Sequence, residues 1–180
     1  MIYTGKGDDG TTGLYLGGRV AKNSAVIRAT GAADEAQTAV GFARAAVRVS
    51  TTPQYDAVLI QIERNLWVLM AEINVEDKNR TKLEPGKSAV TQDMLDDLEE
   101  NIKALDTEYD IPTDFIVPGQ EEVSARLELA RVAVRRAERE CIEIAMPDSL
   151  VIPYLNRLSS YLWALARVFE KQALMSKEGK

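Results

Sequence analysis

The stretch FIVPGQEEVSARLELARVAVRRAERECIEI, residues 115–144, decides the fold of this 180-residue chain. It opens with three apolar residues, which Pro118 and Gly119 bring to an end. A long run follows in which apolar residues recur at intervals of three and four, as is typical of a helix with one buried face. The residues on this face are Val123, Leu127, Ala130, Val134, Ala137, Cys141 and Ile144. We therefore expect a helix over residues 121–145.

Arg131, Arg135 and Glu138 have the same spacing and line the border of this apolar face. Two arginines at positions i and i+4 project side by side from a helix. Because guanidinium groups beside a core are always charged and poorly hydrated, they need anionic partners. These partners are either carboxylates of the protein itself or phosphates of a ligand, and the residues alone leave both possibilities open.

Four further segments have the same helical spacing of apolar residues. They cover residues 31–49, 54–75, 91–105 and 153–173. Thr91 is suited to cap the third helix of the chain, and Pro153 is suited to the first turn of the fifth. Five helices with short connections predict an all-α fold, a five-helix up-and-down bundle with a Gly-rich N-terminal arm. We expect a single domain over residues 1–180, with the arm at 1–25 and the bundle at 26–176.

The same pattern predicts the surroundings of several side chains. Asp34 falls in the first turn of the first helix, where a carboxylate interacts favourably with the helix dipole. Trp67 widens the buried face of the second helix. Leu129 and Val132 lie on the back of the fourth helix, which we expect to be covered on two sides, as in a central helix or at a subunit interface. Asn156, in apolar surroundings, is either a satisfied core amide or a hydrogen-bond donor to a ligand.

Composition excludes several classes of function. The chain has 28 acidic and 22 basic side chains, a net charge of −6, which argues against a surface for nucleic acid or an anionic membrane. The absence of histidine excludes a histidine base, histidine-containing zinc sites and the Glu-x-x-His di-iron motif. No apolar run is long enough to span a bilayer, and the N-terminus lacks a signal pattern. The one cysteine, Cys141, is expected to be an unreactive core thiol in a cytoplasmic protein.

The first 25 residues are rich in glycine, which predicts irregular backbone with positive φ values. Such a loop can point several N–H groups at one anion, and Lys6, Arg19 and Lys22 add positive charge. A phosphate-binding loop and a plain turn-rich arm both remain open. Residues 5–10 also match G-x-G-x-x-G, but a dinucleotide site needs a strand before this motif and a helix directly after it. Only four residues precede the motif and more glycines follow it, so we do not expect a Rossmann oxidoreductase.

Five segments occur in one order that resembles the PduO-type ATP:cob(I)alamin adenosyltransferases, also called corrinoid adenosyltransferases. They are the N-terminal loop and residues 31–35, 115–119, 130–139 and 154–159. The resemblance spans nearly the whole chain. It implies a five-helix bundle that assembles as a homotrimer with active sites between subunits. It also implies that ATP binds with Mg²⁺ and that the N-terminal loop orders over the phosphates.

The resemblance also assigns roles to individual residues. Phe115 matches the phenylalanine that lies under the corrin and displaces the lower axial ligand of cobalt. Arg131 matches an arginine that contacts the phosphates and pairs across the interface with an aspartate matching Asp34. These three are the candidate catalytic residues, and Glu138 is the candidate to contact Mg²⁺. The candidate ATP-binding residues are Thr4, Gly5, Lys6, Gly7, Asp8, Gly10, Thr11, Thr12, Lys22, Arg131, Arg135, Glu138 and Asn156.

The implied reaction transfers the 5′-deoxyadenosyl group of ATP to cob(I)alamin and gives adenosylcobalamin and triphosphate. Because cob(I)alamin is itself the nucleophile, the protein supplies orientation and charge stabilisation, which agrees with the absence of histidine. A flavoprotein or similar reductase and an adenosylcobalamin-dependent enzyme are the implied partners. The loop departs from the common T-K-T-G-D or T-R-T-G-D, since Gly5 takes the basic position and Lys6 follows it. A non-catalytic ATP- or corrinoid-binding module for sensing or delivery is the alternative.

Overall fold

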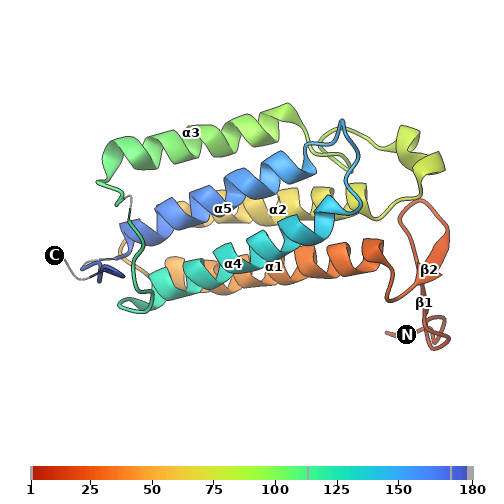
Figure 1. Ribbon diagram of the computed structural model, residues 1–180, viewed down its shortest axis with the longest axis horizontal. Coiled ribbons are helices and arrows are strands. Elements are labelled where there is room, and N and C mark those ends of the chain that lie inside the picture. The colour runs from red at the N-terminus through yellow and green to blue at the C-terminus, as the bar shows by residue number, and fades with distance from the viewer. Residues whose placement is uncertain (1, 113, 171, 178–180) are drawn as a thin grey trace.

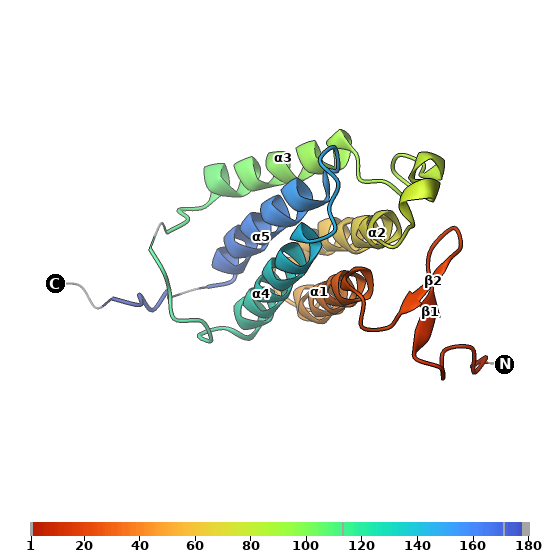
Figure 2. The ribbon, with the colours of Figure 1, turned by 45° about the vertical axis from the view of Figure 1, so that its right-hand side comes forward.

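The computed structural model describes residues 2–112, 114–170 and 172–177, and most of these are helical. Five long helices in this part of the chain run alongside one another and form a bundle (Figures 1 and 2). They are α1 (Ala25–Val47), α2 (Asp56–Ile73), α3 (Gln92–Glu108), α4 (Glu122–Ile142) and α5 (Val151–Val168). Two 3-10 segments, η1 (Pro53–Tyr55) and η2 (Asp77–Lys82), lie in the connections. The predicted five-helix all-α fold is confirmed.

Helices α1 and α4 make the most extensive contact in the bundle. The buried face of α1 is built from alanines such as Ala29, Ala33 and Ala36, and α4 buries Ala130 and Ala137. Small side chains let two helices approach closely, so this pair forms the tight centre of the fold. Helix α4 also packs on α5, and α3 packs on the outer side of α5 (Figure 1). The position of α4 between α1 and α5 agrees with its long apolar stripe.

Two helix boundaries differ from the prediction. Helix α1 begins at Ala25, so it runs through Gly31, which the sequence suggested as the helix start. A glycine within a helix costs only about 1 kcal/mol relative to alanine, and burial of Ala29 and Ala33 on either side offsets this cost. Asp34 therefore lies in the third turn, and its predicted interaction with the helix dipole is wrong. Helix α5 ends at Val168, short of the predicted residue 173; that prediction spans residue 171, which lies outside the described residues.

Other boundaries follow the prediction closely. Helix α4 spans all but the outermost residues of the predicted range 121–145. The hydroxyl of Thr91 accepts a hydrogen bond from the Met94 backbone N–H, so the predicted cap of α3 is confirmed. Pro153 lies in the first turn of α5, as expected. The division into an arm (1–25) and a bundle (26–176) stays a prediction, and it includes residues 1, 113 and 171, which the structure does not describe.

Ahead of α1 the chain forms a small hairpin of β1 (Thr11–Gly13) and β2 (Arg19–Ala21), which pair antiparallel. This hairpin was not predicted, because three-residue strands carry too little alternation to be recognised. Leu16 adopts a φ of 61° and Gly17 and Gly18 a φ of 100°, so the turn needs its glycines. The Tyr15 N–H donates to the Asn74 carbonyl at 2.7 Å, which docks the hairpin on the end of α2. A hairpin rather than a helix follows residues 5–10, which excludes a Rossmann site there.

The exposed fractions of individual side chains show which of them lie in the core as predicted. Cys141 is fully buried, which confirms its predicted place in the core, and this burial raises the pKa of its thiol to about 12. Trp67 is 64% exposed, so its predicted place in the core is wrong. Leu129 and Val132 are 53% and 46% exposed, so the face of α4 that points away from α1 and α5 is left uncovered in a single chain. None of the described helices is both long and apolar enough to cross a membrane.

Candidate functional site

A pocket of about 510 Å³ lies between α4, α5 and the segment that leads into α4. Its lining includes Phe115, Arg131, Arg135, Ser160 and Trp163, and we call it the Phe115 pocket. The structure thus brings together the apolar residue and the two arginines that the sequence singled out. Serine hydroxyls and an indole ring complete a mainly apolar wall, which carries the two arginines and also the carboxylates of Asp106 and Asp114.

Phe115 is 81% exposed, whereas its neighbour Ile116 is only 8% exposed. The alternation arises because this segment is extended, so successive side chains point to opposite sides. The segment is held by backbone hydrogen bonds to the chain after α5. The Val117 N–H donates to the Leu174 carbonyl at 2.7 Å, and the Ser176 N–H donates to the Phe115 carbonyl at 2.9 Å. An exposed aromatic ring is thereby fixed on an anchored backbone.

Arg131 and Arg135 differ in their partners. The Arg131 Nε donates to Glu128 Oε2 at 2.6 Å, and its guanidinium lies 5.9 Å from the Trp163 ring centroid. Arg135 is exposed and has no hydrogen-bond or ion-pair partner among the described residues. Of the two open possibilities, a carboxylate of the protein therefore holds Arg131, while Arg135 is available to a ligand anion.

Glu128 itself was missed by the sequence analysis, although it precedes Arg131 by three residues, a spacing at which helical side chains meet. Its second oxygen, Oε1, accepts from Arg167 Nη2 at 2.7 Å. The Arg167 side chain is 3% exposed. Burial lowers the pKa of the Arg167 guanidinium, and the carboxylates of Glu128 and Glu170 oppose this shift. No spacing signal in the sequence links Arg167 to Glu128, because α5 and α4 meet only in the folded chain.

Glu138 lies further along the same edge of α4, and Asn156 on α5 contacts it. The Asn156 Nδ2 donates to Glu138 Oε1 at 3.2 Å, and Arg157 Nη1 donates to Asn156 Oδ1 at 3.1 Å. Asn156 is exposed, so its interpretation as a core amide is wrong. Within the described part of the chain, no group of three or more His, Cys, Asp or Glu side chains is placed to hold a metal ion.

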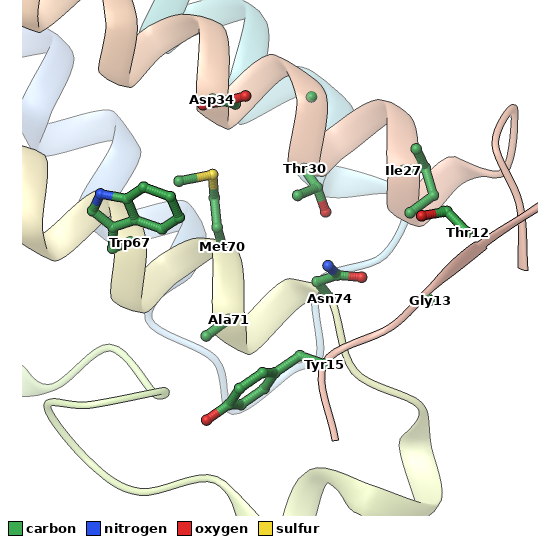
Figure 3. Close-up of a pocket in the computed structure, with 11 residues that line it drawn as sticks. Thr12, Gly13, Tyr15, Ile27, Thr30, Asp34, Trp67, Met70, Ala71 and Asn74 are labelled. Atoms are coloured by element: carbon green, nitrogen blue, oxygen red, sulfur yellow. The ribbon is translucent and has the colours of Figure 1, made fainter. Parts of the chain in front are cut away.

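A second pocket, of about 590 Å³, lies between β1, α1 and α2 (Figure 3). Thr12 comes from the hairpin, Asp34 and Thr30 from α1, and Trp67 and Met70 from α2. We call it the Asp34 pocket. Asp34 is exposed and forms no ion pair with another described residue. An unpaired carboxylate on a mainly apolar wall is a ready partner for a cation from another molecule.

The loop before β1 is organised by two basic side chains. Arg19 Nη2 donates to the Lys6 carbonyl at 2.6 Å, and Arg19 Nε donates to Thr11 Oγ1 at 3.0 Å. The Lys22 ammonium lies beside Gly7, where an added Cβ would come within 3.0 Å of Nζ. Gly10 needs its φ of 80° and accepts from the Lys22 N–H at 2.9 Å. The loop is therefore a defined structure rather than a loose arm.

The remaining loop candidates are close together in this structure. The Thr4 hydroxyl oxygen accepts from the Lys6 N–H at 3.5 Å, and the Asp8 N–H donates to the Gly5 carbonyl at 3.1 Å. Hydrogen bonds from Thr11 to Asp9, first of all from its backbone N–H, lower the pKa of the Asp9 carboxyl. The candidates Thr4 to Thr12 and Lys22 thus form one cluster.

The candidates fall into two groups within a single chain. The loop cluster and the hairpin lie at one end of the bundle, and the segment that leads into α4 lies at the other end (Figure 1). Asp34 lines one pocket and Arg131 lines the other. A single chain therefore does not place Asp34 beside Arg131.

The chain is similar to known proteins in sequence and in fold. A family model described as cobalamin adenosyltransferase matches residues 2–169. The corrinoid adenosyltransferase of Mycobacterium tuberculosis is 39% identical over 172 residues, which cover 93% of this chain and 87% of that protein. The corrinoid adenosyltransferase PduO of Citrobacter freundii is 33% identical over 175 residues, and this chain spans about half of its length.

Solved structures give the same family. A variant PduO-type ATP:corrinoid adenosyltransferase from Lactobacillus reuteri, complexed with cobalamin and ATP, matches with a TM-score of 0.86 and 26% identity. The match covers 100% of this chain and 98% of that one. A second variant from the same organism, complexed with ATP, matches with a TM-score of 0.82 and 25% identity over 98% of this chain and 100% of that one.

Proposed function

The chain belongs to the cobalamin adenosyltransferase family and transfers an adenosyl group from ATP to a corrinoid, and we propose that the corrinoid is cob(I)alamin. The products are then adenosylcobalamin and triphosphate. The observation that carries this proposal is the Phe115 pocket, in which an exposed aromatic ring faces the same 510 Å³ space as Arg131 and Arg135. One pocket thereby offers an apolar contact for a corrin and positive charge for phosphates.

The chemistry needs little from the protein beyond placement. The electron pair of cob(I)alamin attacks C5′ of ATP, the Co–C bond forms, and the C5′–O bond breaks with both electrons leaving on triphosphate. No proton moves, so the absence of histidine is no obstacle. The residues have to align cobalt with C5′ and stabilise the charge that develops on the leaving oxygen.

Phe115 has the position that contact with a corrin requires. A ring that is 81% exposed on an anchored segment gains from being covered by an apolar ligand. Against the lower face of the corrin, the ring displaces the axial ligand of cobalt and excludes water. Removal of that donor makes cob(II)alamin easier to reduce, so Phe115 acts on the reduction that precedes transfer. The electron comes from a flavoprotein or similar reductase.

Arg131 and Arg135 bind the triphosphate of ATP. No described residue pairs with the Arg135 side chain, so it can bind a phosphate without breaking a contact. The Arg131 Nε donates to Glu128, which leaves Nη1 and Nη2 for the phosphates. Mg²⁺ usually binds through one or two carboxylates together with substrate phosphates. The single carboxylate of Glu138, beside Asn156, fits a Mg²⁺ that arrives with ATP. The ion would neutralise part of the triphosphate charge.

A complete site is built from two copies of the chain, and we propose a homotrimer. Asp34 is unpaired within the described residues and lines a pocket, while Arg131 lines a different pocket of the same chain. Pairing of Asp34 with Arg131 of the next copy joins the two pockets. The exposed apolar residues Leu129 and Val132 on α4 are suited to lie in that interface.

A charge swap tests this arrangement. Arg131→Asp combined with Asp34→Arg should restore assembly that either single change weakens, without restoring full ATP affinity. Restoration of both would mean that Arg131 only holds the interface and does not contact phosphates.

The activity itself is tested under anaerobic conditions with cob(I)alamin, ATP and Mg²⁺. We expect adenosylcobalamin to accumulate with turnover, followed by its absorption spectrum and its sensitivity to light. Binding of ATP or corrinoid without product would instead support the non-catalytic module. We also propose a cytoplasmic location, where an adenosylcobalamin-dependent enzyme receives the product; with Cys141 as its one cysteine, the chain has no internal disulfide that would need an oxidising compartment.

A further inference from the structure

A nearly fully buried ion network lies directly behind the Phe115 pocket. Arg167 on α5 is 3% exposed in its side chain and is flanked by Glu128 and Glu170, whose side chains are 8% and 1% exposed. Arg167 Nη2 lies 2.7 Å from Glu128 Oε1 and 3.7 Å from Glu170 Oε2. The hydroxyl of Ser124 donates to Glu170. Burial of three charged groups is costly, and an ordinary helix contact would use apolar side chains here.

Glu128 divides its two oxygens between two arginines. Oε1 accepts from the buried Arg167, and Oε2 accepts from Arg131 Nε at 2.6 Å. Because a carboxylate is planar, fixing one oxygen on an immobile partner fixes the direction of the other. Arg167 is immobile, since it is buried and its guanidinium lies 4.3 Å from the Trp163 ring centroid. Arg131 is consequently held by a carboxylate that cannot turn away.

The bond to Nε determines which part of Arg131 faces the pocket. Arg131 is 26% exposed in its side chain, and its Nη1 and Nη2 have no hydrogen-bond partner among the described residues. A guanidinium held at Nε presents the remaining N–H groups on its outer edge, where they can donate to a phosphate oxygen as well as to Asp34 of the next copy. A free arginine would have to lose side-chain entropy to reach the same geometry on binding.

We propose that Glu128, held in place by Arg167, is a positioning residue that aims Arg131 at the phosphates of ATP. This inference rests on the proposed role of Arg131 in the adenosyl transfer. It assigns a purpose to a buried charge network in which Glu128, Arg167 and Glu170 do not themselves line the Phe115 pocket. The alternative is that the network only stabilises the packing of α4 on α5.

A double-mutant cycle separates the two explanations. Glu128→Gln removes the charge and half of the acceptor capacity with little change in volume. ATP affinity is measured by calorimetric titration for the wild-type chain, Glu128→Gln, Arg131→Ala and the double variant. The matched control is Glu122→Gln, because Glu122 also pairs with an arginine on α4 but is 75% exposed. Helical circular dichroism and oligomeric state are recorded for every variant.

We expect Glu128→Gln to weaken ATP binding about tenfold when Arg131 is present and less than about twofold when Arg131 is alanine. The KM for ATP should rise while the KM for the corrinoid stays unchanged, and Glu122→Gln should have no effect. Equal losses in both backgrounds, or no loss at all, would overturn the positioning role. If Arg131→Ala itself leaves ATP binding intact, the proposed function of Arg131 is wrong, and this is a separate result.

A second variant covers the case in which Glu128→Gln fails to fold. Arg167→Lys keeps the buried charge but replaces the planar guanidinium by a single ammonium, so it cannot hold Glu128 in the same orientation. It should also weaken ATP binding through Arg131 alone. An effect of Arg167→Lys that is independent of Arg131 would contradict the proposal.

Discussion

Replacement of Phe115 by alanine should separate the reduction of cobalt from adenosyl transfer. The ring is 81% exposed, so about a fifth of it is buried in the isolated chain. Complete burial of a phenylalanine contributes about 1.5–3 kcal/mol, and a fifth of that is roughly 0.5 kcal/mol. For a chain of this length, the melting temperature should therefore fall by about 2 °C at most. Stability cannot account for a larger loss of activity.

The assay compares two starting states of the corrinoid. With cob(I)alamin formed beforehand, Phe115→Ala should keep its rate within about threefold of the wild type, since the ring does not act on C5′ of ATP. With cob(II)alamin and a reductant, the rate should fall by at least about tenfold, because the lower ligand stays on cobalt. Val117→Ala, an exposed apolar residue on the same segment, is the control. Equal losses from both starting states would refute the role of Phe115.

Two further predictions concern the hairpin end of the molecule. Gly7→Ala would place a Cβ 3.0 Å from Lys22 Nζ and 3.2 Å from the Thr11 carbonyl oxygen. The affinity for ATP should therefore fall severalfold in titration, while helical circular dichroism stays unchanged. Unchanged affinity would contradict a phosphate-binding loop. Glu72→Ala should leave the Val90 N–H without its acceptor at 2.6 Å and Ser149 without its acceptor at 2.5 Å. Each polar group left without a partner costs about 1–3 kcal/mol, so the free energy of unfolding should fall by roughly 3 kcal/mol. The melting temperature measured by calorimetry should then fall by about 6–12 °C. A fall below about 2 °C would show that Glu72 does not anchor these connections.

Helices could be predicted from the sequence where buried residues recur at a regular interval. Of the apolar stripe predicted for α4, Leu127, Ala130, Val134, Ala137 and Cys141 are fully buried, while Val123 and Ile144 are half-buried. The cap at Thr91 could be predicted because it depends on neighbouring residues alone. The start of α1 could not, since Gly31 suggests a boundary until the packing of α4 against the alanines of α1 is known. Local sequence patterns thus predicted which segments are helical, whereas the helix boundaries depend on packing in the folded chain.

The candidate site shows the same division. Arg131 and Arg135 could be recognised from their spacing, whereas the role of Phe115 was implied only by the family resemblance. Arg167 could not be recognised, because it lies 39 residues from Glu128 and meets it only in the folded bundle. Trp67 was misplaced because periodicity assigns a face to a side chain but does not reveal that the face is left uncovered in a single chain. Sequence spacing therefore identifies side chains that could contact a ligand, such as Arg131, more readily than the residues that position those side chains, such as Arg167.

The central claim is most directly tested by measuring both products of one anaerobic reaction. Cob(I)alamin, ATP and Mg²⁺ are incubated with the wild-type protein, and adenosylcobalamin and the phosphate products are quantified together. Attack at C5′ breaks the C5′–O bond and leaves the phosphate chain whole, so we predict equal amounts of adenosylcobalamin and intact triphosphate. Release of ADP and phosphate without adenosylcobalamin, or no product at all, would contradict the assignment of the Phe115 pocket to adenosyl transfer.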